Sequence, residues 1–297
     1  MITLKSNRLR VELPEPGEAP NNGYRFDYAG FVSDVILDGA MHFCASEPRN
    51  LRHPCSGGRG LCNEYRFDIC DNVKIGEYFP KFGIGLFRKE EEGGYVFYNK
   101  YRDVKPFAVN VRSDGNSAVF KTEPMPCQGY AMGTVKTVSV EGNSLTMIVE
   151  AENTGEKEIS AEEYCHNFIS IDGMAVGSDY LLELPQCPDL GHNRLTGRDG
   201  RPGSLRGNGK GITFCEFSAI DTSFSVNTEE LGKTAPFTWR MIHRGAGAAV
   251  ECEEGFVPSK IAIWAIDHML CPEIFHGFTL KPGEKHKWTR RWKFDLL

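Results

Sequence analysis

Short runs of β-forming residues, separated by Gly, Asn and Asp turns roughly 8–12 residues apart, dominate the sequence. Two neighbouring pairs of runs predict hairpins, with turns at Asp114-Gly115-Asn116 and at Glu141-Gly142-Asn143. Asp-Gly and Gly-Asn steps favour such turns because they tolerate a positive φ. Further strands are predicted at these segments: Phe31–Leu37, Tyr95–Tyr101, Tyr180–Leu184, Ile212–Phe217, Thr238–His243, Ala248–Cys252, Lys260–Ala265 and Trp288–Leu297.

Helical periodicity is nearly absent. No segment of a dozen residues repeats its apolar positions with the period of a helix, and the best candidate, Thr228–Gly232, would form at most one or two turns. The stretch Gly191–Gly211 holds seven glycines and no periodic pattern. Because strand patterns resume on both sides, we interpret it as a long excursion between strands and not as a domain linker.

The length of the chain suits this pattern. All-β sandwiches of well over 200 residues commonly form one unit, and 297 residues can bury a large core. The proportions of apolar (40%) and charged (25%) residues are those of a globular chain. We therefore predict an all-β fold, a large antiparallel sandwich that forms a single domain over residues 1–297.

Charge and cysteine content narrow the possible partners and the compartment. A net charge of −6 argues against a nucleic-acid partner, which would require a basic stripe. The local cluster of Arg49, Arg52, His53 and Arg59 suits a small anionic or polar ligand instead. We find neither an apolar signal segment nor a run of about 18 apolar residues that would span a membrane. Ten scattered cysteines without a CxxC pair indicate reduced thiols, and so a cytoplasmic protein.

A histidine stands in a strand-like segment after the AENTG turn. Side chains alternate faces along a strand, so His166 is expected to point to the same side as Tyr164 and Phe168, away from Cys165 and Asn167. A histidine between two aromatic rings could line a sugar pocket. The alternative is a core histidine that is buried and hydrogen-bonded.

A carboxylate, Glu273, follows Cys271-Pro272 late in the chain. Proline removes a backbone donor and fixes φ, so Glu273 is expected at a strand end or a bulge. From there its side chain would either be solvated at a rim or point into a pocket.

Together these segments resemble the aldose 1-epimerase (galactose mutarotase-like) superfamily. The motifs that carry the resemblance are ENTGEKEISAEEYCHNF, which contains His166, and LCPEIFHGFTLKPGEKHKW, which contains Glu273. The loop GGRGLCNEY at residues 57–65 and the stretch FPKFGIGLF at residues 79–87 resemble the hexose-phosphate-epimerase branch, and RFDYAGFVSDVILDG resembles the family's first sheet. The resemblance implies a β-supersandwich fold and a free sugar as the substrate.

The resemblance also implies residue roles. His166 would be the acid at the ring oxygen and Glu273 the base at the anomeric hydroxyl. The substrate would be held by Arg59, Asn63, Glu64 and Lys81. Arg59 and Glu64 could instead form a salt bridge with each other. The chemistry requires no metal and no organic cofactor, and the spacing of the histidines matches no compact zinc motif: His53, His268 and His276.

Lys81 departs from the family, where most relatives carry a second histidine. A charged lysine donates hydrogen bonds but accepts none, so it could hold an acidic or phosphorylated sugar. The alternative is an exposed lysine on a loop.

Three functions therefore stay open: an aldose 1-epimerase, a hexose-phosphate or uronate epimerase, and a non-catalytic sugar-binding protein of the same fold. Catalysis predicts that His166 and Glu273 flank a cleft about one pyranose apart, whereas burial against a structural partner favours binding alone. The sequence is compatible with a monomer or a homodimer.

Overall fold

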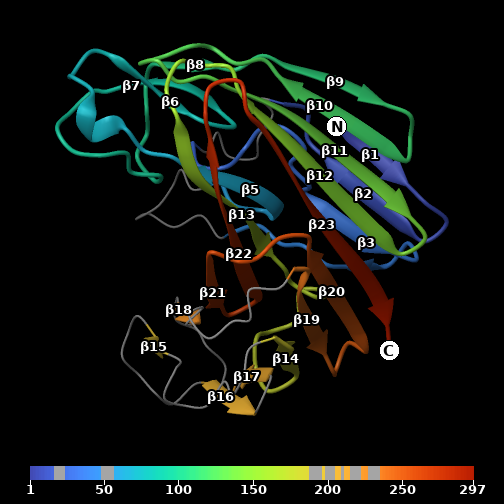
Figure 1. The fold of residues 1–297 in the computed structure, drawn as a ribbon. Helices are drawn as coiled ribbons and strands as arrows, with labels where there is room; N and C mark the ends of the chain where they lie inside the picture. Colours follow the sequence, from blue (N-terminus) through green and yellow to red (C-terminus); the bar gives the residue numbers. More distant parts are fainter. Residues whose placement is uncertain are drawn as a thin grey trace.

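Within the residues that the structure describes, the strands form four antiparallel sheets (Figure 1). The structure, a computed structural model, describes residues 1–16, 24–47, 57–186, 196–197, 205–208, 211–214, 222–226 and 235–297. The small first sheet has the order β1-β2-β3-β4, with the bounds Ile2–Lys5, Leu9–Leu13, Asp34–Leu37 and Met41–His42.

The largest sheet has the order β16-β17-β14-β19-β20-β23-β12-β11-β10-β9, so it joins strands from the middle and the end of the chain. Its strands have these bounds: β9 Val109–Ser113, β10 Ser117–Thr122, β11 Met132–Glu141, β12 Ser144–Asn153, β14 Tyr180–Glu183, β16 Leu205–Asn208, β17 Gly211–Phe214, β19 Phe237–His243, β20 Ala248–Glu254 and β23 Lys285–Leu296.

A six-stranded sheet has the order β15-β18-β21-β22-β13-β5, and a three-stranded sheet the order β6-β7-β8 (Figure 1). The bounds are β5 Gly60–Arg66, β13 Ile159–Phe168, β15 Thr196–Gly197, β18 Thr222–Val226, β21 Lys260–Ile266 and β22 Met269–Leu280, then β6 Tyr78–Lys81, β7 Gly85–Arg88 and β8 Val104–Pro106. A 3-10 turn, η2, spans Cys70–Asn72.

The core lies between the inner faces of the sheets. Buried and part-exposed residues alternate along β11, as expected for a strand with one face on the core. The cluster of buried apolar side chains draws on strands from both large sheets, for example Val138 of β11, Trp292 of β23 and Ile274 of β22. Such a cluster forms because each apolar face removes its surface from water only by packing on another.

The two predicted hairpins are confirmed. β9 pairs with β10 around Asp114-Gly115-Asn116, and β11 pairs with β12 around Gly142, whose φ is 56°. The strand predicted at Tyr95–Tyr101 is wrong. This segment is a loop in which the rings of Tyr95 and Tyr101 stack on each other, 5.7 Å apart, and pack on Phe87. Aromatic residues favour strands, but here packing on the three-stranded sheet decides the conformation.

Glu273 was expected at a strand end, and the structure corrects this in part. β22 runs through Pro272 without ending, but its ladder with β13 stops at the His166–Glu273 pair. The proline occupies a position where the backbone of β13 is not paired. The Asn167 side chain instead donates a hydrogen bond of 2.6 Å to the Pro272 carbonyl. The predicted helix Thr228–Gly232 and most of Gly191–Gly211 lie outside the described residues.

Buried charges connect the two large sheets. Lys136 of β11 contacts Asp27 at 2.7 Å and Asn63 of β5 at 2.8 Å, and Asn63 in turn donates to Glu163 of β13. Arg290 of β23 is paired with Glu163 and with Glu254 of β20, each at 2.8 Å. The indole nitrogens of Trp288 and Trp239 donate to the same two glutamates. We call these residues the ionic core: Asp27, Asn63, Lys136, Glu163, Glu254 and Arg290.

The seven cysteines within the described residues are free thiols, as expected: Cys44, Cys62, Cys70, Cys127, Cys165, Cys252 and Cys271. Across the same residues, no helix is both long and apolar enough to cross a membrane.

Replacing Arg290 with Met should lower the free energy of unfolding by about 3–5 kcal/mol, because Glu163 and Glu254 would keep buried charges without their cation. Denaturant unfolding of the purified variant measures this. Arg291→Met is the matched control, since that side chain is exposed on the same strand, and it should change stability by less than about 0.5 kcal/mol. Equal effects of the two substitutions would contradict a structural role for the ionic core.

Candidate active site

The strand β13 divides its side chains between the core and a candidate site. Glu163, Cys165 and Asn167 point inward, where Asn167 accepts a hydrogen bond from the Trp292 indole at 3.0 Å. Tyr164, His166 and Phe168 point outward, and the rings of His166 and Phe168 stack with centroids 3.9 Å apart. The predicted alternation around His166 is therefore confirmed.

His166 and Glu273 are cross-strand neighbours in the register of β13 and β22. His166 Nε2 lies 3.2 Å from Glu273 Oε1, and the two side chains are 4% and 11% exposed. The two groups are therefore in contact and not about one pyranose apart, the separation that catalysis was taken to predict. Directly opposed residues on adjacent strands hold their side chains within contact distance. Both groups can therefore contact neighbouring atoms of one ligand.

Aromatic rings enclose the histidine. Phe168 stacks on it, while Phe26 and Trp264 meet it edge-on, at centroid distances of 5.8 and 5.6 Å. Gly58 completes the enclosure, because a Cβ there would lie 2.1 Å from the Phe168 ring. The other ring nitrogen, Nδ1, has no hydrogen-bond partner among the described residues. Packing, and not a hydrogen bond to Nδ1, orients the His166 ring.

A second carboxylate, Glu64 of β5, lies on the same face and is fully paired. Arg25 Nε donates to Glu64 at 2.8 Å, Lys81 Nζ donates to it at 3.2 Å, and the Tyr164 hydroxyl donates to it as well. Arg25 also donates to the Tyr164 hydroxyl at 2.8 Å, and its guanidinium lies over the rings of Phe26 and Phe97. Two cations against one carboxylate leave this cluster with a net positive charge.

The two carboxylates have opposite pKa shifts. Burial raises the pKa of Glu273 to about 7, and Arg25 opposes this rise only in part. Burial would also raise the pKa of Glu64, but the charges of Lys81 and Arg25 outweigh it and lower that pKa to about 2. Burial, and then the charge of Arg25, holds the pKa of His166 well below its usual range. Near neutral pH, therefore, Glu64 is ionised, His166 is neutral and Glu273 is divided between both forms.

Three of the predicted substrate-binding residues, Lys81, Asn63 and Arg59, have different surroundings in the structure. Lys81, at the end of β6, is neither exposed nor on a loop: it is 3% exposed, pairs with Glu64 and bonds the Tyr65 carbonyl at 2.8 Å. Asn63, also predicted to hold the substrate, belongs to the ionic core on the inner face of β5, where it contacts Glu163 and Lys136. Successive strand residues face opposite sides, which separates Asn63 from Glu64.

Arg59 donates through Nε to the Ser33 carbonyl at 3.0 Å, and the Arg59–Glu64 salt bridge does not form because Glu64 pairs with Arg25 and Lys81. The other members of the basic cluster, Arg49, Arg52 and His53, lie outside the described residues. In the part of the chain that the structure describes, no three metal-ligating side chains come together.

Sequence reasoning missed Arg25, Phe26 and Trp264. The first two belong to the RFDYAG segment, which was interpreted only as part of the first sheet. Arg25 reaches Tyr164, 139 positions later in the chain, so no local pattern indicates the contact. An aromatic residue next to an arginine is the only signal that the sequence offers there.

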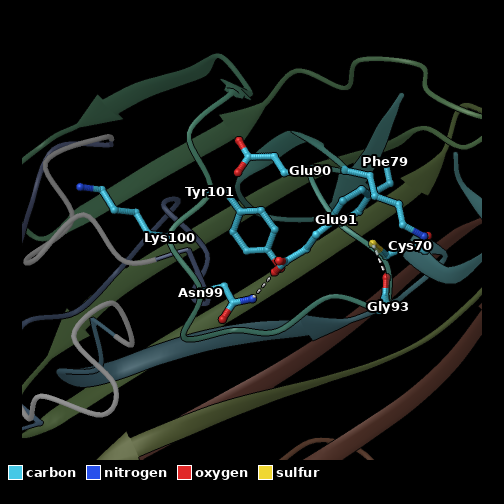
Figure 2. Close-up of a pocket in the computed structure, with 10 residues that line it drawn as sticks. Cys70, Phe79, Glu90, Glu91, Gly93, Asn99, Lys100 and Tyr101 are labelled. Carbon is cyan, nitrogen blue, oxygen red and sulfur yellow. Dashed lines mark hydrogen bonds between the residues drawn. The ribbon is translucent and has the colours of Figure 1, made fainter. Parts of the chain in front are cut away.

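Two surface hollows differ in size and position. One, of about 420 Å³, lies on the outer face of the six-stranded sheet and is lined by Arg66, Glu162, Gly277 and Thr279 among others. The other lies beside the three-stranded sheet, near Tyr101 and Cys70, with Glu91 accepting a hydrogen bond from Asn99 (Figure 2). Its volume of about 40 Å³ holds a water or two and no sugar.

Comparisons with known proteins give a match at the level of structure. No family model and no curated protein matches the sequence. A galactose mutarotase related enzyme from Lactobacillus acidophilus has a TM-score of 0.60 at 13% identity, over 99% of this chain and 97% of that chain. A galactose mutarotase-like protein from Clostridium acetobutylicum has a TM-score of 0.59 at 11% identity, over 99% and 95%. The GalM/aldose epimerase homologue from C. elegans has a TM-score of 0.55 at 12% identity, over 100% and 98%.

The chain has the galactose mutarotase-like fold. This confirms the predicted all-β sandwich and the resemblance on which the expected site was based. Sequence identities this low establish the architecture, and the galactose mutarotase-like fold alone does not assign an activity. The chemistry has to be argued from the His166–Glu273 pair and its surroundings.

The Glu273 carboxyl should titrate near pH 7, far above an exposed glutamate, and Arg25→Met should raise its pKa further because a cation that favours the ionised form is removed. Carbon-13 NMR of glutamate-labelled protein measures both, with Glu273→Gln to assign the signal. Lys285→Met is the control, since it removes an exposed cation from β23 that pairs with Glu152. A Glu273 pKa that is ordinary, or insensitive to Arg25, would contradict this electrostatic description.

Proposed function

We propose that this protein is an aldose 1-epimerase-like isomerase, which interconverts the α and β anomers of a free or substituted aldose. The observation that carries the proposal is the contact of 3.2 Å between His166 Nε2 and Glu273 Oε1, a buried pair among aromatic rings on the outer face of the six-stranded sheet. Anomer exchange needs one proton removed from the anomeric hydroxyl and one delivered to the ring oxygen. These two oxygens are bonded to the same carbon, so an acid and a base that touch each other suit them.

His166 and Glu273 can carry out both proton transfers of the reaction. In the ion-pair form, the Glu273 carboxylate takes the proton of the anomeric hydroxyl while the His166 imidazolium gives its proton to the ring oxygen. The bond between C1 and the ring oxygen breaks, and the sugar opens to an aldehyde. After rotation about C1–C2, the reverse transfers close the ring on the other face of C1. Each positioned group contributes about 10²–10⁴-fold to such a rate.

The pair also supports the return step. Ring opening leaves His166 neutral and Glu273 protonated, which is the form that burial of both groups favours. Transfer of one proton across the 3.2 Å contact converts this form into the ion-pair form before a sugar reacts, and the reverse transfers during ring closure restore the ion-pair form. The two groups therefore act as one unit that holds a single proton and titrates as a pair.

The partner in this proposal is a small sugar, the reaction uses no cofactor, and reduced thiols suit a cytoplasmic location. A second candidate is a sugar-binding protein of the same fold without catalysis. The burial of His166 and Glu273 against each other favours it, because each has a structural partner. Turnover measurements on variants of the pair separate the two functions.

His166→Asn and Glu273→Gln should each reduce the rate of anomer exchange at least about 100-fold, because one proton transfer then lacks its group. Polarimetry or saturation-transfer NMR on several free aldoses measures the rate. His268→Asn and Glu150→Gln are the controls: both side chains are ion-paired away from the pair, with Asp267 and Lys287. Both should keep the wild-type rate, and an active His166 or Glu273 variant would refute the mechanism.

The rate should fall as the pH rises above about 7, because the pair then loses its single proton and keeps only bases. A lone carboxylate base with an ordinary pKa would give a rate that rises and then stays level over this range. A pH profile of kcat distinguishes the two. A profile without the fall near pH 7 would contradict the shared proton while leaving open a simple carboxylate base.

A further inference from the structure

The outer face of the six-stranded sheet continues beyond the His166–Glu273 pair in ordered rows of side chains. The register places Tyr164 beside Glu64 and Phe275, and Phe275 beside Lys260 of β21. The next row holds Arg66 of β5, then Glu162 and Gly277. Each row lies two residues, or about 6.6 Å, further along the strands.

Two cations lie next to one aromatic ring on this face. The Lys260 ammonium is 4.8 Å and the Arg66 guanidinium 5.9 Å from the centre of the Phe275 ring, and that ring stacks on Tyr164 at 4.3 Å. Among the described residues, no carboxylate lies within ion-pair distance of either cation. Glu162, the carboxylate nearest in register, accepts a hydrogen bond from Ser259 at 3.0 Å. Cations without an ion-pair partner remain available to a ligand.

The outer face around the His166–Glu273 pair carries an excess of positive charge, whereas the whole chain is negative. The cations on this face are Arg25, Lys81, Arg66 and Lys260, against the carboxylates Glu64 and Glu162 and the titrating Glu273. The chain as a whole carries a formal charge of −6. Arg25, Lys260 and Arg66 each favour the ionised form of Glu273, so their fields extend to the pair. A local excess of positive charge on an acidic protein attracts a small anion.

The hollow of about 420 Å³ gives room for such a group. Arg66 and Gly277 line it, whereas Lys260 lies one row nearer to the His166–Glu273 pair. The rows that carry Lys260 and Arg66 are one and two steps from the row of His166 and Glu273. One row, about 6.6 Å, is comparable to the length of a hexose. The Arg66 guanidinium reaches back from the second row to within 5.9 Å of the Phe275 ring, so one ligand can contact the pair and both cations.

We propose that Arg66 and Lys260 form an anion subsite beside the His166–Glu273 pair, and that the sugar bound at the pair carries a phosphate or carboxylate group remote from its anomeric carbon. The proposal rests on the sugar site of the proposed function. The sequence suggested that Lys81 holds an anionic group, but Lys81 is ion-paired with Glu64. In this proposal Arg66 and Lys260 hold that group instead.

Binding of methyl glycosides tests the subsite without turnover, because a blocked anomeric carbon cannot exchange. Methyl glucoside, methyl glucoside 6-phosphate and methyl glucuronide would be titrated by calorimetry or NMR. At least one anionic glycoside should bind about tenfold or more tightly than the neutral one, and the advantage should shrink with added salt. The two anionic glycosides tell a phosphate from a carboxylate.

Lys260→Met and Arg66→Met should each weaken the favoured anionic glycoside about tenfold and leave the neutral one unchanged. Lys121→Met and Arg112→Met, exposed cations on β10 and β9, are the matched controls and should change neither. Equal binding of neutral and anionic glycosides, or an anionic preference that survives both substitutions, would overturn the subsite.

Rates of anomer exchange on glucose, glucose 6-phosphate and glucuronate are measured separately. If no sugar exchanges but a Lys260-dependent anionic preference persists, the subsite stands and the isomerase function fails. If exchange occurs without any anionic preference in binding or in kcat/KM, the isomerase function stands and the subsite fails.

Discussion

The ionic core is the constraint on which the candidate site depends. It joins β11, β20 and β23 of the largest sheet to β5 and β13 of the six-stranded sheet through side chains that are almost wholly buried. Burying a charge costs desolvation free energy, and only a complete set of ion-pair and hydrogen-bond partners offsets that cost. One relative position of the two sheets satisfies Lys136, Glu163 and Arg290 together. That position also fixes β13, whose outer face carries His166.

The division of β13 between two faces explains how one strand serves both stability and chemistry. Glu163 points inward to Arg290 and Trp288, and His166, three residues later, points outward to Glu273. The same alternation on β5 gives Asn63 to the core and Glu64 to the site. The site is thus built on the reverse side of the strands that carry the ionic core.

The neighbouring groups give the two outward carboxyls, Glu64 and Glu273, different pKa values. Glu64 has two cations and a tyrosine hydroxyl around it, and its pKa is lowered to about 2, so it acts as a fixed charge that orients Arg25, Lys81 and Tyr164. Glu273 has the buried His166 as its contact, and its pKa is raised to about 7, where proton transfer in either direction is easy. Two neighbouring carboxyls whose environments push their pKa values apart are typical of functional sites.

The sequence by itself determined the local features of this protein. Strand periodicity and turn residues predicted the all-β class and both hairpins, and alternation placed His166 on the face of Tyr164 and Phe168. Glu273 entered through family-like motifs, since neither its spacing nor its neighbours singled it out. Tyr95–Tyr101 was misassigned because its rings pack on each other and on Phe87, a contact that β-propensity does not encode.

Only the tertiary structure decided which residues meet. The contact of His166 with Glu273, the burial of Lys81 against Glu64 and the reach of Arg25 to Tyr164 all join segments far apart in the chain. Asn63 and Glu64 are adjacent in sequence, yet one lies in the ionic core and the other in the candidate site. Patterns along a strand reveal the period of a face, but the register between strands and the packing of sheets determine its neighbours, and with them the charge and pKa of each group.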